Sequence, residues 1–140
     1  MVEIGGEIRA RGNSPRGTLW KVAIDDPNTD GSRSQSRTIE LNNQSMATSG
    51  NYRKFKVNSN GEKVVHTVNP KTGLAQENNL LSASVLIQGD CADVDAYATA
   101  FMAMGLEETK VFLANRPDLK VVLLYANKDC LLYTSDAADD

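Results

Sequence analysis

The chain has 140 residues, of which 41% are hydrophobic and 24% are charged, and its formal net charge is −3. This composition is typical of one globular domain with a modest core. The mild acidity argues against a dedicated nucleic-acid binder, which usually presents a basic patch. Two cysteines and a single histidine, His66, exclude a zinc cluster and a catalytic pair of histidines. No apolar run approaches the roughly 20 residues that a membrane-spanning helix needs.

The predicted elements follow one another as short strands, then two helices, then a final strand. Apolar patterning indicates the strands, and the Ala-rich segment ending at Gly105 indicates the first helix, with Asp90 or Asp93 as its N-cap. Pro117 stops the second helix. In chain order we expect strands at residues 2–4, 8–10, 19–24, 37–42, 52–57, 63–68 and 81–87, helices at 91–104 and 106–115, and a strand at 120–125.

Glycine and asparagine mark turns between these elements. The pair Gly5-Gly6 permits a tight turn with positive φ, and Asn60-Gly61 is a strong hairpin signal. The residues 47–50 are predicted to form a loop between two strands. The sequence therefore predicts an α+β fold, with a mainly antiparallel sheet and two C-terminal helices.

The two ends of the chain differ from its middle. Residues 1–12 carry charges where a signal peptide has an apolar core, and they begin in a strand, as the interior of a domain does. Residues 130–140 (CLLYTSDAADD) follow the last predicted strand without any periodicity. We expect one domain at residues 1–129, lacking an N-terminal half, and a non-native or disordered tail at residues 130–140.

Asp95 and Thr99 are the residues with the clearest potential for chemistry. They are four residues apart in the first predicted helix, so their oxygens lie on one helix face. A carboxylate and a hydroxyl are hard oxygen ligands that suit Mg²⁺ beside a phosphate. From spacing alone, however, the plainer interpretation is favoured, in which Asp95 stabilises the helix N-terminus and Thr99 packs or bonds to the backbone.

The segment Ala47, Thr48, Ser49 and Gly50 is rich in hydroxyl groups and backbone donors. A loop of this composition can hold phosphate oxygens. Taken by itself, an ordinary Ser/Thr turn explains it equally simply and is the more common case.

His66 and the Gly5-Gly6-Glu7 turn have similar alternatives. A single histidine in a predicted strand is more often a hydrogen-bonded structural residue than a catalyst. Glu7 follows the turn as either a binding carboxylate or an exposed charge, and the exposed charge is the default interpretation. None of these residues identifies a function on its own.

Taken in order, five segments resemble the FAD:protein FMN transferase family, known as ApbE. The family shows a Gly-Gly-acid turn, a Trp strand ending in Pro, an Ala-Thr-Ser-Gly-x-Tyr segment, a His-x-x-Asp-Pro-x-x-Gly turn and an Asp-x-x-x-Thr helix ending in Gly. In this chain the corresponding segments are VEIGGEIRARG, LWKVAIDDP, MATSGNYR, HTVNPKTG and VDAYATAFMAMG. The resemblance covers residues 2 to about 126 and corresponds to the C-terminal half of the family's domain.

The resemblance implies Mg²⁺-dependent transfer of FMN from FAD to a Thr hydroxyl of a target flavoprotein, with release of AMP. Some members instead hydrolyse FAD to FMN and AMP. The chemistry requires charge neutralisation at the pyrophosphate and positioning of the nucleophile. The family also implies a location at the periplasmic or outer face of the bacterial inner membrane, and any membrane association is expected to depend on an N-terminal anchor outside this sequence. No nucleic-acid partner is expected, as the mild acidity of the chain indicates.

The resemblance assigns roles to the candidate residues. It implies that Asp95 and Thr99 bind the metal and that His66 is catalytic and contacts the flavin pyrophosphate. The residues that it implies to contact FAD, besides His66, are Gly5, Gly6, Glu7, Ala47, Thr48, Ser49 and Gly50.

Two departures from the family pattern leave alternatives open. Asn69 stands where the family has Asp, which keeps an acceptor but removes a charge. The missing half supplies a Lys-Gly stretch and a backbone metal ligand in the family. The alternatives are a flavin-nucleotide binding domain or a structural remnant without catalysis. Without the missing half we also expect an exposed sheet edge and apolar surface, which favour aggregation or pairing with another chain.

Overall fold

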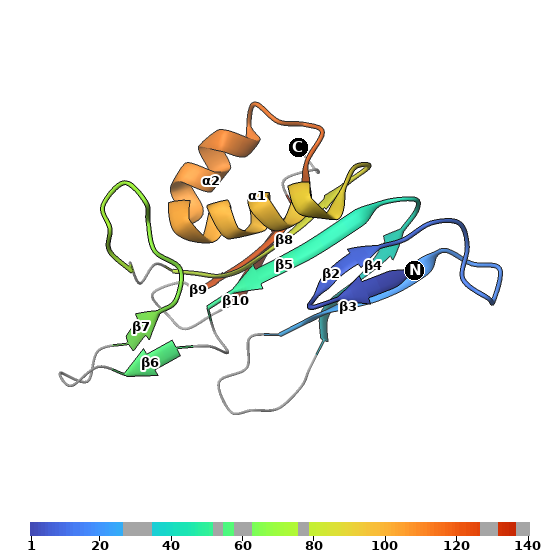
Figure 1. Cartoon of the computed structure of the whole chain (residues 1–140), viewed down its shortest axis with the longest axis horizontal. Coiled ribbons are helices and arrows are strands. Elements are labelled where there is room, and N and C mark those ends of the chain that lie inside the picture. Colours follow the sequence, from blue (N-terminus) through green and yellow to red (C-terminus); the bar gives the residue numbers. More distant parts are fainter. Residues whose placement is uncertain (27–34, 52–54, 58–62, 76–78, 127–131, 137–140) are drawn as a thin grey trace.

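The computed structural model describes residues 1–26, 35–51, 55–57, 63–75, 79–126 and 132–136. Within these residues the chain forms ten strands and two helices, arranged as the α+β fold that the sequence predicts (Figure 1). The elements are β1 (Val2–Ile4), β2 (Glu7–Arg9), β3 (Trp20–Asp25), β4 (Gln35–Leu41), β5 (Ser45–Gly50), β6 (Phe55–Val57), β7 (Lys63–Val65), β8 (Leu80–Ile87), α1 (Cys91–Met104), α2 (Leu106–Leu113), β9 (Lys120–Ala126) and β10 (Leu132–Asp136).

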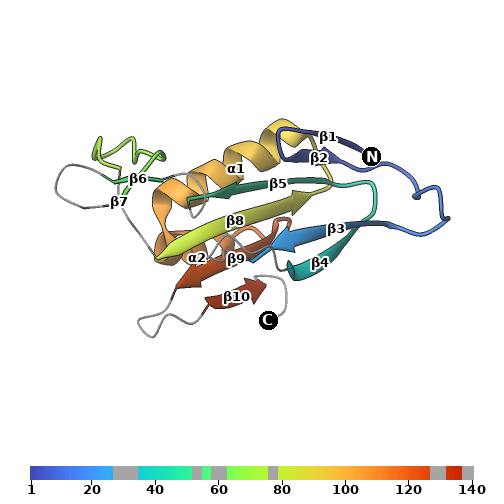
Figure 2. The ribbon, with the colours of Figure 1, turned by 90° about the horizontal axis from the view of Figure 1, so that it is seen from below.

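Six of the strands form one antiparallel sheet in the order β1-β2-β5-β8-β9-β10. The strands β3 and β4 form a separate two-stranded ribbon, and β6 pairs only with β7. The two helices cover one face of the sheet, and the β3–β4 ribbon lies on the opposite side (Figures 1 and 2). The sheet is thus the middle layer of the molecule.

The helix face of the sheet carries one hydrophobic core. Alternate residues of a strand point to the same face, so Val85 of β8 and Val121 and Leu123 of β9 meet the helices together. Val94 and Phe101 of α1 are fully buried against them. Burying a side chain of this size contributes roughly 1.5–3 kcal/mol, and this packing holds α1 along the sheet.

The opposite face carries a second core. Leu86 and Val122, one residue along from Val85 and Val121, point away from the helices and are buried. Ile24 and Leu41 of the ribbon and Met46 of β5 complete this cluster. Both faces of the sheet are therefore anchored, which fixes the position of β5 between them.

The ends of α1 agree with the sequence prediction. Asp90 is the N-cap residue, with extended φ and ψ angles of −81° and 153°, although its side chain makes no capping hydrogen bond. Gly105 ends the helix with a positive φ of 82°, and its N–H donates to the carbonyl of Phe101. The Thr109 hydroxyl of α2 donates to the same carbonyl at 3.4 Å, so the two helices are joined at a fixed corner.

Several predicted elements differ from the structure. Residues 47–50 are not a loop but the second part of β5, fully paired with β8. The strand predicted at residues 63–68 ends at Val65, so His66 lies after β7 and not within a strand.

The C-terminal tail contains β10, which pairs with β9, although the sequence of the tail shows no strand pattern. The non-native origin of the tail stays a prediction. The predicted hairpin turn at residues 58–62 lies outside the described residues, and α2 ends at Leu113.

Within the described residues, neither helix has the length and apolarity required to cross a membrane.

Candidate functional site

Helix α1 and strand β5 together form the central part of the candidate site. The chain leaves β8, turns at Gly89 and runs back as α1 over β5 and β8. This return places Thr99 above Ser49 of β5, with the two side-chain oxygens 3.2 Å apart. Asp95 and Thr99 are both exposed on α1, and Asp95 makes no hydrogen bond or ion pair with a described residue.

The start of α1 is held by residues that the sequence did not single out. Ser45 of β5 donates its hydroxyl to the Gly89 carbonyl at 2.6 Å. Arg9 of β2 donates to the same carbonyl at 2.9 Å and to the Ser45 hydroxyl at 3.2 Å. These contacts fix where α1 begins relative to β5. Because Arg9 and Gly89 are 80 residues apart, no local pattern could have revealed them.

Strand alternation separates the candidate hydroxyls of β5. Ala47 and Ser49 point to the helix face, while Thr48 points to the opposite face and pairs with the Ser84 hydroxyl at 2.7 Å. The loop predicted for these residues is therefore wrong, because they form a strand, and their contact with FAD stays a prediction. The strand presents Ser49, and not Thr48, to Thr99.

Gly5 and Gly6 form the two-residue turn between β1 and β2. Their φ angles of 68° and 106° are both positive, as a type I′ hairpin turn requires. Glu7 folds back over this turn, with its Oε2 atom 3.0 Å from where a Cβ on Gly5 would lie. Gly6 and Thr48 line one cleft of about 350 Å³ on the ribbon side of the sheet. The structure thus brings these two predicted FAD contacts together, away from Thr99.

His66 lies on an exposed turn that is tied to both β5 and α1. The Thr67 hydroxyl donates to the side-chain carbonyl of Asn51, the residue after β5, at 3.3 Å. The Asn69 amide donates to the Ala103 carbonyl near the end of α1 at 3.5 Å and accepts from the Lys71 N–H at 2.9 Å. The turn that carries His66 therefore borders the same helix and strand as Asp95, Thr99 and Ser49.

The donor set on α1 fits a hard divalent cation. Asp95 offers an unengaged carboxylate and Thr99 a hydroxyl one helical turn later, which are the oxygen ligands that Mg²⁺ prefers. The described residues contain no cluster of three or more His, Cys, Asp or Glu side chains that could hold a metal by themselves. The remaining ligands would therefore come from water, phosphate oxygens or other parts of the protein.

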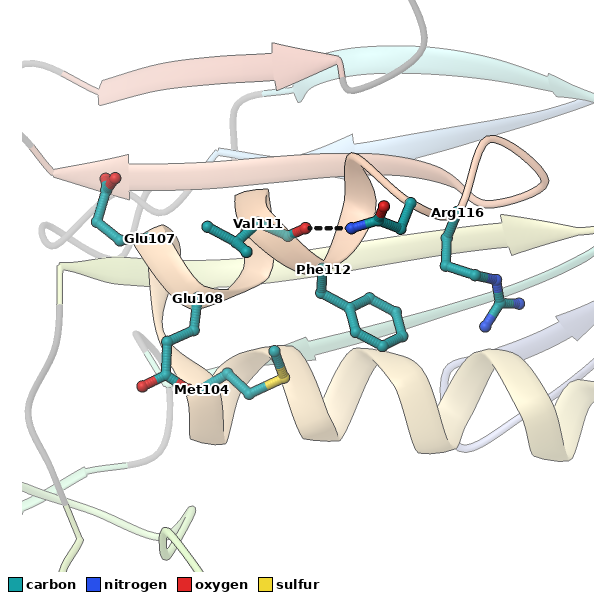
Figure 3. Close-up of a pocket in the computed structure, with 7 residues that line it drawn as sticks. Met104, Glu107, Glu108, Val111, Phe112 and Arg116 are labelled. Carbon is teal, nitrogen blue, oxygen red and sulfur yellow. Dashed lines mark hydrogen bonds between the residues drawn. The ribbon is translucent and has the colours of Figure 1, made fainter.

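An apolar groove of about 650 Å³ lies elsewhere, on the outer side of α2 (Figure 3). Met104, Val111 and Phe112 provide its apolar lining, and Arg116 lies at one end. The residues predicted for the site are absent from its lining within the described part of the chain.

Comparison with known proteins places this geometry in a family. The model of the ApbE family matches residues 1–123. The chain belongs to the ApbE family. Its curated relatives include the FAD:protein FMN transferases of Haemophilus influenzae and Vibrio cholerae. The former is 36% identical over 138 residues, which is 99% of this chain and 39% of the relative. The latter is 36% identical over 129 residues, covering 92% of this chain and 37% of the relative.

Solved ApbE structures share the fold. The flavin transferase ApbE from Vibrio cholerae superposes with a TM-score of 0.77 at 32% identity, covering 97% of this chain and 42% of that one. The apo flavinyl transferase ApbE of Pseudomonas stutzeri gives a TM-score of 0.76 at 28% identity, covering 96% and 40%. These matches confirm the resemblance seen in the sequence. This ApbE chain spans about two fifths of the length of the relatives it matches, so its fold is part of the family's domain.

Proposed function

We propose that this ApbE chain is the C-terminal part of a Mg²⁺-dependent enzyme that transfers FMN from FAD to a Thr hydroxyl of a target flavoprotein and releases AMP. Two findings support this proposal. The relatives are named FAD:protein FMN transferases, and Asp95 and Thr99 form an exposed oxygen pair beside Ser49. The position of Asp95, which has no partner among the described residues, is the observation that carries the proposal.

The proposed reaction replaces the phosphoanhydride bond of FAD with a phosphoester bond to the target. The Thr hydroxyl oxygen of the target forms a bond to the FMN phosphorus, the pyrophosphate bond of FAD breaks, AMP leaves, and the hydroxyl proton is released to a base or to water. Mg²⁺ would neutralise negative charge on the pyrophosphate oxygens. In the proposal, Asp95 and Thr99 hold this cation on α1.

The other candidate residues would bind and orient FAD. His66, on the turn beside α1, would contact the flavin pyrophosphate and take part in catalysis. Ser49 lies on the helix face of β5, where a pyrophosphate held by the cation would lie. Ala47, which is buried on the same face, and Gly50, the last residue of the strand, would border this position. Gly5, Gly6 and Glu7 would contact the flavin nucleotide from the β1–β2 turn. Thr48 could join them only from the ribbon side, where it shares a cleft with Gly6.

The direct test is flavin transfer with a matched pair of acidic variants. The chain is incubated with FAD, Mg²⁺ and a flavoprotein domain that contains an acceptor Thr, and covalent flavin is read as fluorescence on a denaturing gel. We expect Asp95→Ala to abolish transfer, because it removes the charged ligand. Asp93→Ala removes an exposed carboxylate two residues earlier on the same helix and should leave transfer intact.

The other outcomes separate the alternatives. Release of free FMN and AMP without covalent flavin would indicate FAD hydrolysis. Mg²⁺-dependent FAD binding without either product would indicate a binding domain, and no FAD binding would indicate a structural remnant. Transfer that persists undiminished in Asp95→Ala would overturn the metal assignment.

A further inference from the structure

Within the described residues, the Thr99 hydroxyl has one side-chain hydrogen-bond partner, the Ser49 hydroxyl. The two oxygens are 3.2 Å apart, although the residues are 50 positions apart in sequence. Ser49 is half-buried and Thr99 is exposed. A contact between a strand and a helix of this kind exists only because α1 folds back over β5.

When a threonine hydroxyl binds a cation, its proton still needs a hydrogen-bond acceptor. Its hydroxyl has one O–H and two lone pairs, and a cation attracts a lone pair while it repels the proton. The proton must then point to an acceptor on the side away from the cation. The Ser49 oxygen, 3.2 Å away, is within reach to accept it, although this separation is long for a bond between two hydroxyl groups.

The contact also selects a side-chain rotamer. In a helix, threonine divides between two χ1 rotamers because its hydroxyl can bond back to a carbonyl one turn earlier. For Thr99 that carbonyl belongs to Asp95, and a bond to it would use the hydroxyl proton within the helix. The Thr99 hydroxyl instead lies 3.2 Å from the Ser49 hydroxyl of β5, and either oxygen could be the donor of this hydrogen bond.

We propose that Ser49 is a positioning residue: it accepts the Thr99 hydroxyl proton, fixes the Thr99 rotamer and leaves a Thr99 lone pair free for the cation beside Asp95. This inference rests on the proposed function, because the cation belongs to it. Ser49 is suited to the role since it lies within β5, where it pairs with Ala83 of β8. A residue on a rigid strand orients its partner more accurately than one on a loop.

The first test reads the Thr99 rotamer without any metal. Three-bond NMR couplings to the Thr99 γ-methyl carbon report its χ1 angle in the full chain. We expect single-rotamer couplings in the unaltered chain, averaged couplings in Ser49→Ala, and recovery in Ser49→Thr, which restores a hydroxyl. Ser14→Ala is the matched control, because it removes a hydroxyl from a similar 3.1 Å pair with Thr18 in an exposed turn.

The second test measures metal affinity with Mn²⁺ as the probe, followed by its paramagnetic resonance signal in the presence of FAD. Loss of a group that orients a metal ligand typically weakens binding by about tenfold or more. We expect a loss of this size in Ser49→Ala, recovery in Ser49→Thr, and no change in Ser14→Ala.

The results distinguish this inference from the proposed function. Unchanged Thr99 couplings in Ser49→Ala would overturn the inference, and so would averaged couplings with unchanged Mn²⁺ affinity. If the unaltered chain bound no Mn²⁺ while its couplings responded as expected, the metal site of the proposed function would fail, and Ser49 would retain only a structural contact with Thr99.

Discussion

Thr48 and Ser49 are neighbours in sequence whose hydroxyl groups lie on opposite faces of the sheet. Ser49 meets Thr99 at 3.2 Å on the helix face, while Thr48 meets Ser84 at 2.7 Å on the ribbon face. Ser84 is only 1% exposed, and on the same face the buried Ser82 hydroxyl has no partner among the described residues. The Ser49 hydroxyl therefore contacts the proposed metal ligand Thr99, whereas the Thr48 hydroxyl is the partner of the buried Ser84 hydroxyl.

This difference predicts that Thr48→Val destabilises the fold. The variant keeps the shape of the side chain but leaves the buried Ser84 hydroxyl without its partner, which costs about 1–3 kcal/mol. Urea unfolding should show a lower midpoint with an unchanged slope. Thr38→Val, at an exposed position of β4, should change stability by less than about 0.5 kcal/mol. Equal midpoints for the two variants would contradict the role of the Thr48–Ser84 pair.

The sequence could predict candidate residues but not which of them meet. Asp95 and Thr99 share a helix, so their common face follows from the helical repeat alone. Ser49 joins them only through the packing of α1 on β5, which depends on contacts across the whole sheet. Arg9 and Ser45, which fix the start of α1, carry no local signal for the same reason.

At the scale of elements, Arg116 links the segment after α2 to α1. Arg116 donates to both carboxylate oxygens of Asp118, at 2.8 Å and 2.7 Å, and to the Tyr97 hydroxyl at 2.6 Å. Its guanidinium also lies over the rings of Tyr97 and Phe112, 5.1 Å and 5.9 Å from their centres. The hydrogen bonds from Arg116 lower the pKa of Asp118 below its ordinary value of 3.8.

The hydrogen bonds between Arg116 and Asp118 predict that a small part of the folding stability is lost at acidic pH. Because the pKa of Asp118 is lower in the folded chain than in the unfolded chain, its stabilising contribution is present above pH 3.8 and is lost as the pH falls through the folded value. Asp118→Asn should therefore have a lower Tm than the unaltered chain at pH 6, and the difference should shrink as the pH falls below 3.8. Thermal unfolding followed by circular dichroism measures both.

A suitable control for this prediction is Asp93→Asn on α1. Its carboxylate has no hydrogen bond or ion pair with any other residue that the structure describes, so the Tm difference caused by Asp118→Asn should exceed that of the control at pH 6. A difference for Asp118→Asn that stays constant down to pH 2.5 would show that the Arg116 contact does not contribute in this way.

Element boundaries were predictable where the chain itself marks them. Helix α1 ends as expected because Gly105 takes a positive φ that other residues adopt at a cost. The end of β7 was not predictable, because the strand stops where Val65 pairs with Phe55 of β6, and this pairing leaves no signal in the local pattern of residues 63–68. Strand β10 depends on pairing with β9 rather than on its own pattern.

At the scale of the whole molecule, the helix layer is narrower than the sheet. Helix α1 covers β5 and β8 and reaches β2, but β1 lies beyond it at the sheet edge. Val2 and Ile4 are 60% and 74% exposed there. Within the described residues no strand pairs with the outer side of β1, so apolar side chains and unpaired backbone groups occur together.

Such an edge predicts concentration-dependent self-association through β1. Natural edge strands are commonly protected by lysine, whose charge opposes pairing with another strand. We expect Ile4→Lys to reduce the weight-average mass measured by sedimentation velocity at high protein concentration. Val111→Lys is the matched control, because Val111 is similarly exposed at 70% but lies on α2, where the helix satisfies its own backbone groups. If Val111→Lys reduced association and Ile4→Lys did not, the apolar groove on α2, and not the sheet edge, would be the surface through which copies of the chain meet.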